Sequence, residues 1–252
     1  MTEIDKEIEA ALFLSRSKGV GAALFKELIE KYKTPSIALN YWQEKQLDKK
    51  LKLVSLTKNN TESSILKTLE AIKSKKILAF YYGQTGYPKQ LEALTEPPPI
   101  IYLSSEIKNK PFAAVVGSRN ANEDQLKKAE KLTLKLIKDG YAIISGGAIG
   151  IDKVAHETAI RESAYTIAVL ANGLDVVYPK SNKSLLEEIK NMGTLMTELM
   201  IGALPQKGFF PTRNRLIAAL ADIVIALPTT NSKGTLITAQ WAKKLGKKLI
   251  YE

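Results

Sequence analysis

The spacing of apolar positions changes near residue 75, and this change divides the chain into two regions. Up to that point apolar residues recur every three or four positions, as at Ile8, Ala11 and Leu12, which is the spacing of one helix face. This pattern predicts helices over 4–14, 22–32, 37–47 and 64–74. Beyond it, short apolar runs alternate with helical patterns. We therefore expect a small all-helical domain over 1–75 and an α/β domain over 76–252.

A glycine turn, Lys18-Gly19-Val20-Gly21, separates the first two predicted helices. Helix, Gly-Val-Gly and helix in this order are typical of a helix-hairpin-helix, in which backbone N–H groups often contact DNA phosphates. A tight turn that only packs two helices against each other has the same pattern. Both interpretations stay open at this stage.

A proline-stiffened lead-in over 77–103 precedes a regular alternation of strands and helices. The apolar runs are rich in β-branched residues, which is typical of a parallel sheet covered by helices on both faces. In such a doubly wound sheet, ligands bind at the carboxyl ends of the strands. The predicted strands are 112–116, 141–144, 166–170, 194–199, 223–227 and 248–251, and the predicted helices are 123–138, 149–161, 184–191, 212–221 and 235–245.

The stretch Ser145–Asp152 stands at the centre of the second region, between an apolar run and a helical pattern. Its residues are Ser-Gly-Gly-Ala-Ile-Gly-Ile-Asp. Glycines let a backbone approach a ligand closely, and a helix start leaves N–H groups without partners. We therefore expect this turn to hold a phosphate group. Asp152 either caps the helix or takes part in the site.

Three other loops, 117–120, 172–179 and 207–215, also follow predicted strand ends. Gly117-Ser118-Arg119-Asn120 offers a glycine, a hydroxyl and a guanidinium, which together suit a phosphate. The Gly-x-Gly-x-x-Gly spacing of dinucleotide sites is absent there. In the loop 172–179 we expect Gly173 and Pro179 to set the shape, and Ser232–Thr235 completes the row at another helix start. Lys243 and Lys244 either extend a basic surface or are simply solvated.

The loop Lys207–Arg215 combines two aromatic residues with a lysine and two arginines. Stacking surfaces next to cations are typical of sites for single-stranded nucleic acid, where each stacked base contributes about 1–3 kcal/mol. In the alternative interpretation one phenylalanine belongs to the core and one arginine pairs with Asp222 or Glu198. We expect at least one of these arginines to be structural.

The composition narrows the class of partner. The chain of 252 residues carries a formal net charge of +11, which favours polyanions, nucleic acid before anionic membrane, unless it reflects a general lysine bias. No apolar run reaches the length of about 18 residues that a membrane-spanning helix needs. The absence of cysteine excludes disulfides and thiolate chemistry and fits a cytoplasmic location. We expect no membrane partner.

The sequence gives little support for catalysis. His156 is the only histidine, without an evident serine or cysteine partner, and is better explained as a helix-surface or packing residue. Glu198 is the best candidate for a buried acid, but one acid does not define a mechanism. Paired carboxylates, a Walker-type lysine and metal-ligand spacings are all missing. We expect neither a metal nor a cofactor.

Taken together and in order, these loops resemble the DNA-processing protein A (DprA/Smf) family. The helical 1–75 region resembles that family's N-terminal helix-hairpin-helix, or sterile-alpha-motif-like, domain. The stretches that carry the resemblance are 115–119, 145–152 with Ala155-His156, 173–175 with Tyr178-Pro179, 210–217, 234–239, and the lead-in residues Tyr87-Pro88 and 97–102.

The resemblance implies an extended Rossmann-like, doubly wound, mostly parallel sheet that binds single-stranded DNA and forms a homodimer. It also implies that the protein loads RecA recombinase onto incoming DNA in natural transformation (competence), without catalysis. The role of Glu198 stays open because the family more often has Ser-Glu-x-Pro where this chain has Thr197-Glu198-Leu199-Met200. The DNA-binding positions that the resemblance implies are Gly117, Ser118, Arg119, Ser145, Gly146, Gly147, Lys207, Phe210, Arg213, Asn214, Arg215 and Lys244.

An enzyme that acts on nucleoside monophosphates is the alternative prediction. The phosphoribohydrolases once labelled lysine decarboxylases have a related fold and resemble this chain in their glycine-rich loops. Their signature is Pro-Gly-Gly-x-Gly-Thr-x-x-Glu, whereas this chain has Thr238 at the glutamate position. The acid that cleavage of a glycosidic bond requires is therefore missing.

Overall fold

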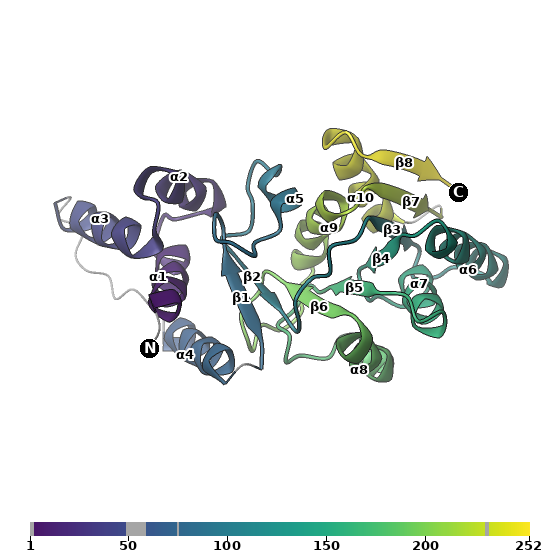
Figure 1. The fold of residues 1–252 in the computed structure, drawn as a ribbon, viewed down its shortest axis with the longest axis horizontal. Helices are drawn as coiled ribbons and strands as arrows, with labels where there is room; N and C mark the ends of the chain where they lie inside the picture. The colour runs from purple at the N-terminus through teal and green to yellow at the C-terminus, as the bar shows by residue number, and fades with distance from the viewer. Residues whose placement is uncertain (1–2, 49–58, 75, 230–231) are drawn as a thin grey trace. The chain divides into compact units, whose positions relative to one another are not determined.

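The computed structural model of the protein describes residues 3–48, 59–74, 76–229 and 232–252. It divides into two compact units, Met1–Tyr102 and Leu103–Glu252 (Figure 1). Lys75, where the sequence pattern places a domain boundary, lies outside the described residues. That boundary stays a prediction.

The first unit begins with helices that pack through the apolar faces expected from the sequence. Ile8 and Leu12 of the first helix, Phe25 of the second and Ile65 of the fourth are buried. Gly19 adopts a φ of +87°, and a Cβ there would lie 3.6 Å from the ring of Trp42. The glycine turn therefore packs on the third helix, and a DNA contact by this turn stays a prediction. The helices are α1 (Glu3–Arg16), α2 (Ala22–Tyr32), α3 (Pro35–Asp48) and α4 (Asn59–Lys73).

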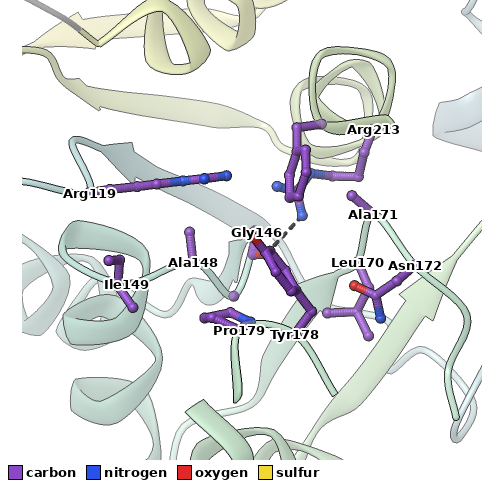
Figure 2. A pocket seen from close by; sticks show the side chains of 12 residues that line it. Arg119, Gly146, Ala148, Ile149, Leu170, Ala171, Asn172, Tyr178, Pro179 and Arg213 are labelled. Carbon is purple, nitrogen blue, oxygen red and sulfur yellow. Dashed lines mark hydrogen bonds between the residues drawn. The ribbon is translucent and has the colours of Figure 1, made fainter. Parts of the chain in front are cut away.

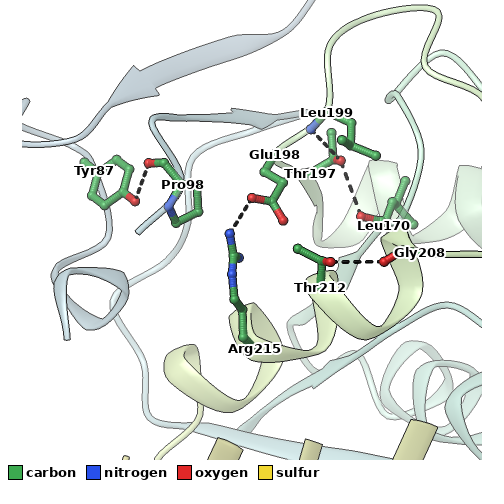
Figure 3. Close-up of polar contacts among 9 residues, drawn as sticks. All are labelled: Tyr87, Pro98, Leu170, Thr197, Glu198, Leu199, Gly208, Thr212 and Arg215. Carbon is green, nitrogen blue, oxygen red and sulfur yellow. Dashed lines mark hydrogen bonds and ion pairs between the residues drawn. The ribbon is translucent and has the colours of Figure 1, made fainter. Parts of the chain in front are cut away.

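The lead-in forms β1 (Leu78–Tyr81), the short α5 (Lys89–Glu92) and β2 (Ile100–Leu103), and β1 and β2 are neighbours in the sheet. The Tyr87 hydroxyl donates a hydrogen bond of 2.8 Å to the carbonyl of Pro98 (Figure 3). The ring of Tyr82 meets the ring of Tyr87 edge-on. The lead-in is thus a packed part of the first unit.

The second unit is a parallel sheet, as the strand–helix alternation predicts. Its strands are β3 (Phe112–Gly117), β4 (Ala142–Ser145), β5 (Thr166–Val169), β6 (Thr194–Thr197), β7 (Ile223–Leu227) and β8 (Lys248–Tyr251). They lie in the order β6-β5-β4-β3-β7-β8, and neighbouring strands in this order run parallel. The chain moves outward from β3 to β6 and then returns to the other side of β3. The carboxyl ends of β3 and β7 are therefore the topological switch point, where ligands of such sheets bind.

Helices cover both faces of this sheet. Ala113 and Val115 of β3 pack with α6 (Glu123–Lys138) and α7 (Ile151–Arg161) in one apolar cluster. Ala114 and Val116, which point the opposite way, are also buried, on the face that α9 (Phe209–Leu220) and α10 (Lys233–Lys244) contact. Figure 1 shows these two helix pairs on opposite sides of β3 and β7, with α8 (Lys183–Met192) following the short 3-10 helix η1 (Lys180–Asn182). The predicted fold class is confirmed.

Several element boundaries differ from the prediction by one to five residues, the largest difference being the start of α4 at Asn59 instead of 64. Two of these differences have a local reason. α9 begins at Phe209, three residues before the predicted start, because Pro211 lies in the first turn, where its missing N–H is tolerated. β6 ends at Thr197, two residues early, since the Thr197 hydroxyl accepts the N–H of Leu199 and turns the chain. None of the described helices combines the length and the apolar composition that crossing a membrane requires.

Candidate functional site

A cleft of about 850 Å³ opens at the carboxyl ends of β3 and β7, within the second unit. The loops after both strands line it, together with the starts of α9 and α10. The loops after β4 and β5 line a smaller pocket (Figure 2). The residues that line both it and the cleft are Arg119, Ala148, Tyr178, Phe210 and Arg213. Of the predicted site residues, Gly117, Ser118, Arg119, Lys207, Phe210, Arg213 and Asn214 line the cleft, and Gly146 and Gly147 line the smaller pocket.

An arginine and two aromatic rings line both pockets. The guanidinium carbon of Arg119 lies 4.9 Å from the centroid of the Phe210 ring. The Phe210 and Tyr178 ring centroids are 5.7 Å apart. Neither Phe209 nor Phe210 is buried, so the interpretation that one of them belongs to the core is wrong. Tyr178, which the sequence pattern indicated only as part of a shaping loop, is 37% exposed and lines both pockets.

Arg213 lies at the floor of the site and is held by the protein itself. It is 5% exposed, and its Nη1 donates to the carbonyl of Gly146 at 2.8 Å (Figure 2). The same nitrogen donates to the carbonyl of Val169. The Nε of Arg213 donates to Asn214 Oδ1 at 3.1 Å. Burial lowers the pKa of Arg213 to about 10, against the opposing effect of Asp152, so the guanidinium stays charged at neutral pH. The hydrogen bonds of Arg213 therefore stabilise the floor of the site, and its charge is not exposed to a ligand as that of a surface arginine would be.

The glycine turn 145–152 already contains an acidic side chain of the protein, that of Asp152. Asp152 is 7% exposed and accepts the N–H of Gly146 at 3.2 Å. Burial raises the pKa of Asp152, while Arg213 and the backbone N–H groups of Ala148, Gly117 and Gly146 oppose that rise. The expectation that these N–H groups point outward to a phosphate is wrong at Gly146, because its N–H donates to Asp152. Asp152 thus holds the turn from within and also lines the cleft, so a part in the site stays a prediction.

Close backbone packing explains the glycines of this turn. A Cβ on Gly146 would lie 2.5 Å from Arg213 Nη2 and 2.7 Å from Asp152 Oδ2. A Cβ on Gly117 would lie 2.4 Å from Ile151. Gly150 has a φ of +81°, and its Cβ would meet the carbonyl oxygen of Ser118 at 2.3 Å. The loops after β3 and β4 thus interlock through glycine.

Three predicted site residues are not brought into either pocket. Arg215 donates to Glu198 at 2.7 Å, with side-chain exposures of 10% and 16% (Figure 3). This pair confirms the expectation that at least one arginine is structural, and it gives Glu198 a role. The Ser145 hydroxyl donates to the Val115 carbonyl at 2.7 Å and is fully buried. Lys244 is exposed over the ring of Trp241.

His156 is buried in the unit and does not line the cleft. Its Nδ1 lies 2.8 Å from Thr166 Oγ1, which itself donates to the carbonyl of Ile143. The Thr166 hydroxyl is therefore the acceptor, and His156 carries its proton on Nδ1. Burial lowers the pKa of His156 to about 3, with the charge of Arg213 acting in the same direction. The packing role is correct, and a helix-surface position is wrong.

Exposed basic side chains give the lining of the cleft a positive charge. Lys207, Lys233 and Arg119 are exposed and line it, and Asp152 is the one acidic side chain among its described lining residues. Since Asp152 is buried and accepts the N–H of Gly146, the exposed cations have no exposed carboxylate beside them in the described lining. Among the residues that the structure describes, no three His, Asp or Glu side chains gather as metal ligands.

The position that would carry the glutamate of a phosphoribohydrolase holds a structural threonine. The Thr238 hydroxyl donates to the carbonyl of Gly234 at 3.2 Å, one turn back along α10. Thr238 is 1% exposed. The cleft therefore has no acid at this position, and its geometry does not support the phosphoribohydrolase alternative.

The sequence and the fold are those of a known class of DNA-processing proteins. The sequence model of the family described as DNA recombination-mediator protein A matches residues 79–251. The chain belongs to this family.

Its curated relatives include the protein Smf of Synechocystis sp., which is 30% identical over 92% of this chain and 61% of its own length. The DNA processing protein DprA of Streptococcus pneumoniae is 37% identical over 64% of this chain and 57% of its own length. The chain thus spans less than two thirds of either relative. The DprA of Bacillus subtilis is 29% identical over 86% of this chain and 78% of its own length.

Two solved structures are similar in fold and sequence. The crystal structure of DprA from Streptococcus pneumoniae has a TM-score of 0.64 and 32% identity, covering 76% of this chain and 69% of that one. The structure of DNA processing protein A from Helicobacter pylori has a TM-score of 0.62 and 30% identity, covering 70% and 80%. The Helicobacter pylori protein is described as having a single-stranded DNA binding mode of its own.

Proposed function

We propose that this protein binds single-stranded DNA in the cleft at the switch point of its parallel sheet. The observation that carries the proposal is the Arg119 guanidinium over the Phe210 ring, beside the exposed Lys207. Bases stack on aromatic rings and on guanidinium planes, while lysines follow the phosphates of the strand. A single strand presents both groups at once, whereas a duplex hides its base faces.

The proposed role in the cell is that of a recombination mediator. The protein would load RecA recombinase onto incoming single-stranded DNA in natural transformation, as a cytoplasmic homodimer. This role rests on family membership and on the strand-binding cleft. This role requires no catalytic group in the cleft.

The double variant Arg119→Ala/Lys207→Ala tests the cleft directly. We expect it to weaken binding of an oligo-dT strand about tenfold or more at low salt. The logarithm of the association constant falls with the logarithm of the salt concentration, and the magnitude of this slope should decrease by about 0.7 for each lost phosphate contact. Fluorescence anisotropy over a salt series measures both quantities.

The matched control is Lys131→Ala/Lys135→Ala, which removes two exposed charges from α6, outside the cleft. We expect this variant to lose less than threefold in affinity. Equal losses in the two double variants would mean that the strand responds only to net charge, and the cleft assignment would then be wrong.

A further inference from the structure

The first turn of α10 has a polar arrangement that neither the sequence nor the family comparison assigns to a ligand. It forms one wall of the cleft through Ser232, Lys233, Gly234 and Thr235. The first backbone N–H to be satisfied within the helix is that of Leu236, which donates to the carbonyl of Ser232 at 3.2 Å. The N–H groups of the three preceding positions have no intrahelical acceptor.

The N-cap residue does not cap this turn. Ser232 makes no side-chain capping bond, because its Oγ accepts the N–H of Thr229 at 2.8 Å. No hydrogen bond from the first-turn N–H groups to another described residue is present. A serine at the N-cap ordinarily occupies one of these donors. Among the described residues, the N–H donors of this turn therefore have no partner, and the turn lines the cleft.

The hydroxyl of Thr235 is the second, independent observation. Thr235 is 4% exposed and lines the cleft, and its Oγ1 has no hydrogen-bond partner in the described structure. A buried hydroxyl without a partner is unfavourable, and a ligand that supplies an acceptor removes the penalty. The matching threonine one turn on, Thr238, has its partner within the helix.

A chain of hydroxyls leads from α10 to Ser118 on the opposite loop. The Ser232 and Thr229 hydroxyls lie 2.8 Å apart, and Thr229 donates to Ser118 Oγ at 3.1 Å. Ser118 Oγ also accepts the N–H of Asn120, and its own proton has no acceptor among the described residues. Since Ser118 is 7% exposed and lines the cleft, the chain ends in a donor that faces it.

These donors share one preference, an oxyanion of single or partial negative charge. Lys233 is exposed beside the turn and adds a positive charge. Asn214 fixes the turn to the floor of the site, because its Nδ2 donates to Gly234 O at 3.0 Å while its Oδ1 accepts from Arg213. A phosphate group is the natural ligand of open helix N–H groups next to hydroxyl donors.

We propose that the first turn of α10 binds one backbone phosphodiester of the DNA strand, with the Thr235 hydroxyl and the open N–H groups as donors. This inference rests on the proposed function, because the phosphodiester belongs to the strand in the cleft. Ser118 and Lys233 contribute to the same subsite. The stacking and the charges of Arg119, Phe210 and Lys207 act on the rest of the strand.

The test compares Thr235→Val with the wild-type protein, using a 5′-hydroxyl oligo-dT strand. We expect about tenfold weaker binding, because a hydrogen bond to a charged oxygen is lost. The salt slope should stay unchanged, since Thr235 carries no charge. Thr235→Ser keeps the hydroxyl and should bind within twofold of the wild type. Lys233→Ala should reduce the slope by about 0.7.

Thr133→Val is the matched control, because Thr133 is also a buried helical threonine but lies on α6 outside the cleft. We expect its affinity for the strand to equal that of the wild type. Urea unfolding should show that Thr235→Val is at least as stable as the wild type, since its hydroxyl has no partner to lose.

Three outcomes would overturn the inference. If Thr235→Val binds as the wild type does while Arg119→Ala/Lys207→Ala is weakened, the subsite is wrong and the proposed function stands. If the effect of Thr235→Val appears only on a 5′-phosphorylated strand, the ligand is a terminal phosphomonoester instead. If the wild type does not bind the strand at all, both proposals fail together.

Discussion

Two glycine-containing turns, one before α7 and one at the start of α10, differ in what satisfies their donors. In the turn before α7 the N–H of Gly146 donates to the protein's own Asp152, and the carbonyl of Gly146 accepts from Arg213. At the start of α10 the N-cap Ser232 is engaged elsewhere and the Thr235 hydroxyl has no described partner. A glycine-rich turn thus indicates close packing, and only its hydrogen-bond partners show whether an external anion can bind there.

The largest expected effect comes from a substitution that removes hydrogen bonds from the turn before α7. Replacing Arg213 by methionine keeps much of the side chain's volume but leaves the carbonyls of Gly146 and Val169 without their donor and removes the positive charge that acts on the buried Asp152. We expect the free energy of unfolding to fall by about 3–5 kcal/mol, as measured by urea denaturation. A loss below about 1 kcal/mol would contradict the role given to Arg213. Adding Asp152→Asn to Arg213→Met should recover part of the stability.

The acid stability of the protein should depend on His156, which lies in α7, one turn after Asp152. Its folded pKa of about 3 is below the unfolded value of about 6.5, so the unfolded chain binds the extra proton between these pH values. This stabilisation is complete above pH 6.5 and is lost as the pH falls toward 3.

The variant His156→Leu removes the titrating group while Thr166 keeps its own bond to Ile143. Between pH 6 and pH 4, we expect the wild type to lose about 1.4 kcal/mol per pH unit more than the variant does. Urea denaturation at several pH values measures this difference. Parallel curves for the two proteins would contradict a neutral, buried His156.

Replacing Gly146 or Gly234 by alanine compares the packing of the two turns directly. At Gly146 the new Cβ meets Arg213 and Asp152 within 2.7 Å, so we expect a loss of about 1–3 kcal/mol. At Gly234 the nearest atom lies at 3.8 Å, and alanine should be neutral or stabilise by up to about 1 kcal/mol. Thermal unfolding of the two variants measures the contrast. Similar losses at both positions would mean that the turns are equally packed.

The sequence predicted the fold well because its signals are local. The β-branched strands and the regular helices between them define the parallel sheet, and Gly140 ends α6 with a φ of +89°, as expected. The start of α9 was misplaced because Phe209–Pro211 looks like a loop in sequence, although proline fits a first helical turn.

The site was predicted in part, for an equally physical reason. Residue type shows that Arg119, Arg213 and Arg215 carry charge, but only the fold shows that Arg215 pairs with Glu198 and that Arg213 is buried. The open donors of α10 could not be predicted, because they depend on Thr229 drawing away the Ser232 hydroxyl. The sequence did contain a signal for Tyr178, because it is an aromatic residue directly before Pro179 in a loop that follows a strand.

The central claim is that the cleft selects a single strand. A salt titration comparing single- and double-stranded oligonucleotides of equal length and composition tests it most directly. We expect clearly tighter binding of the single strand at every salt concentration, with affinity falling steeply as salt rises. Equal or tighter binding of the duplex would contradict the account, because stacking on Phe210 and Arg119 requires exposed bases.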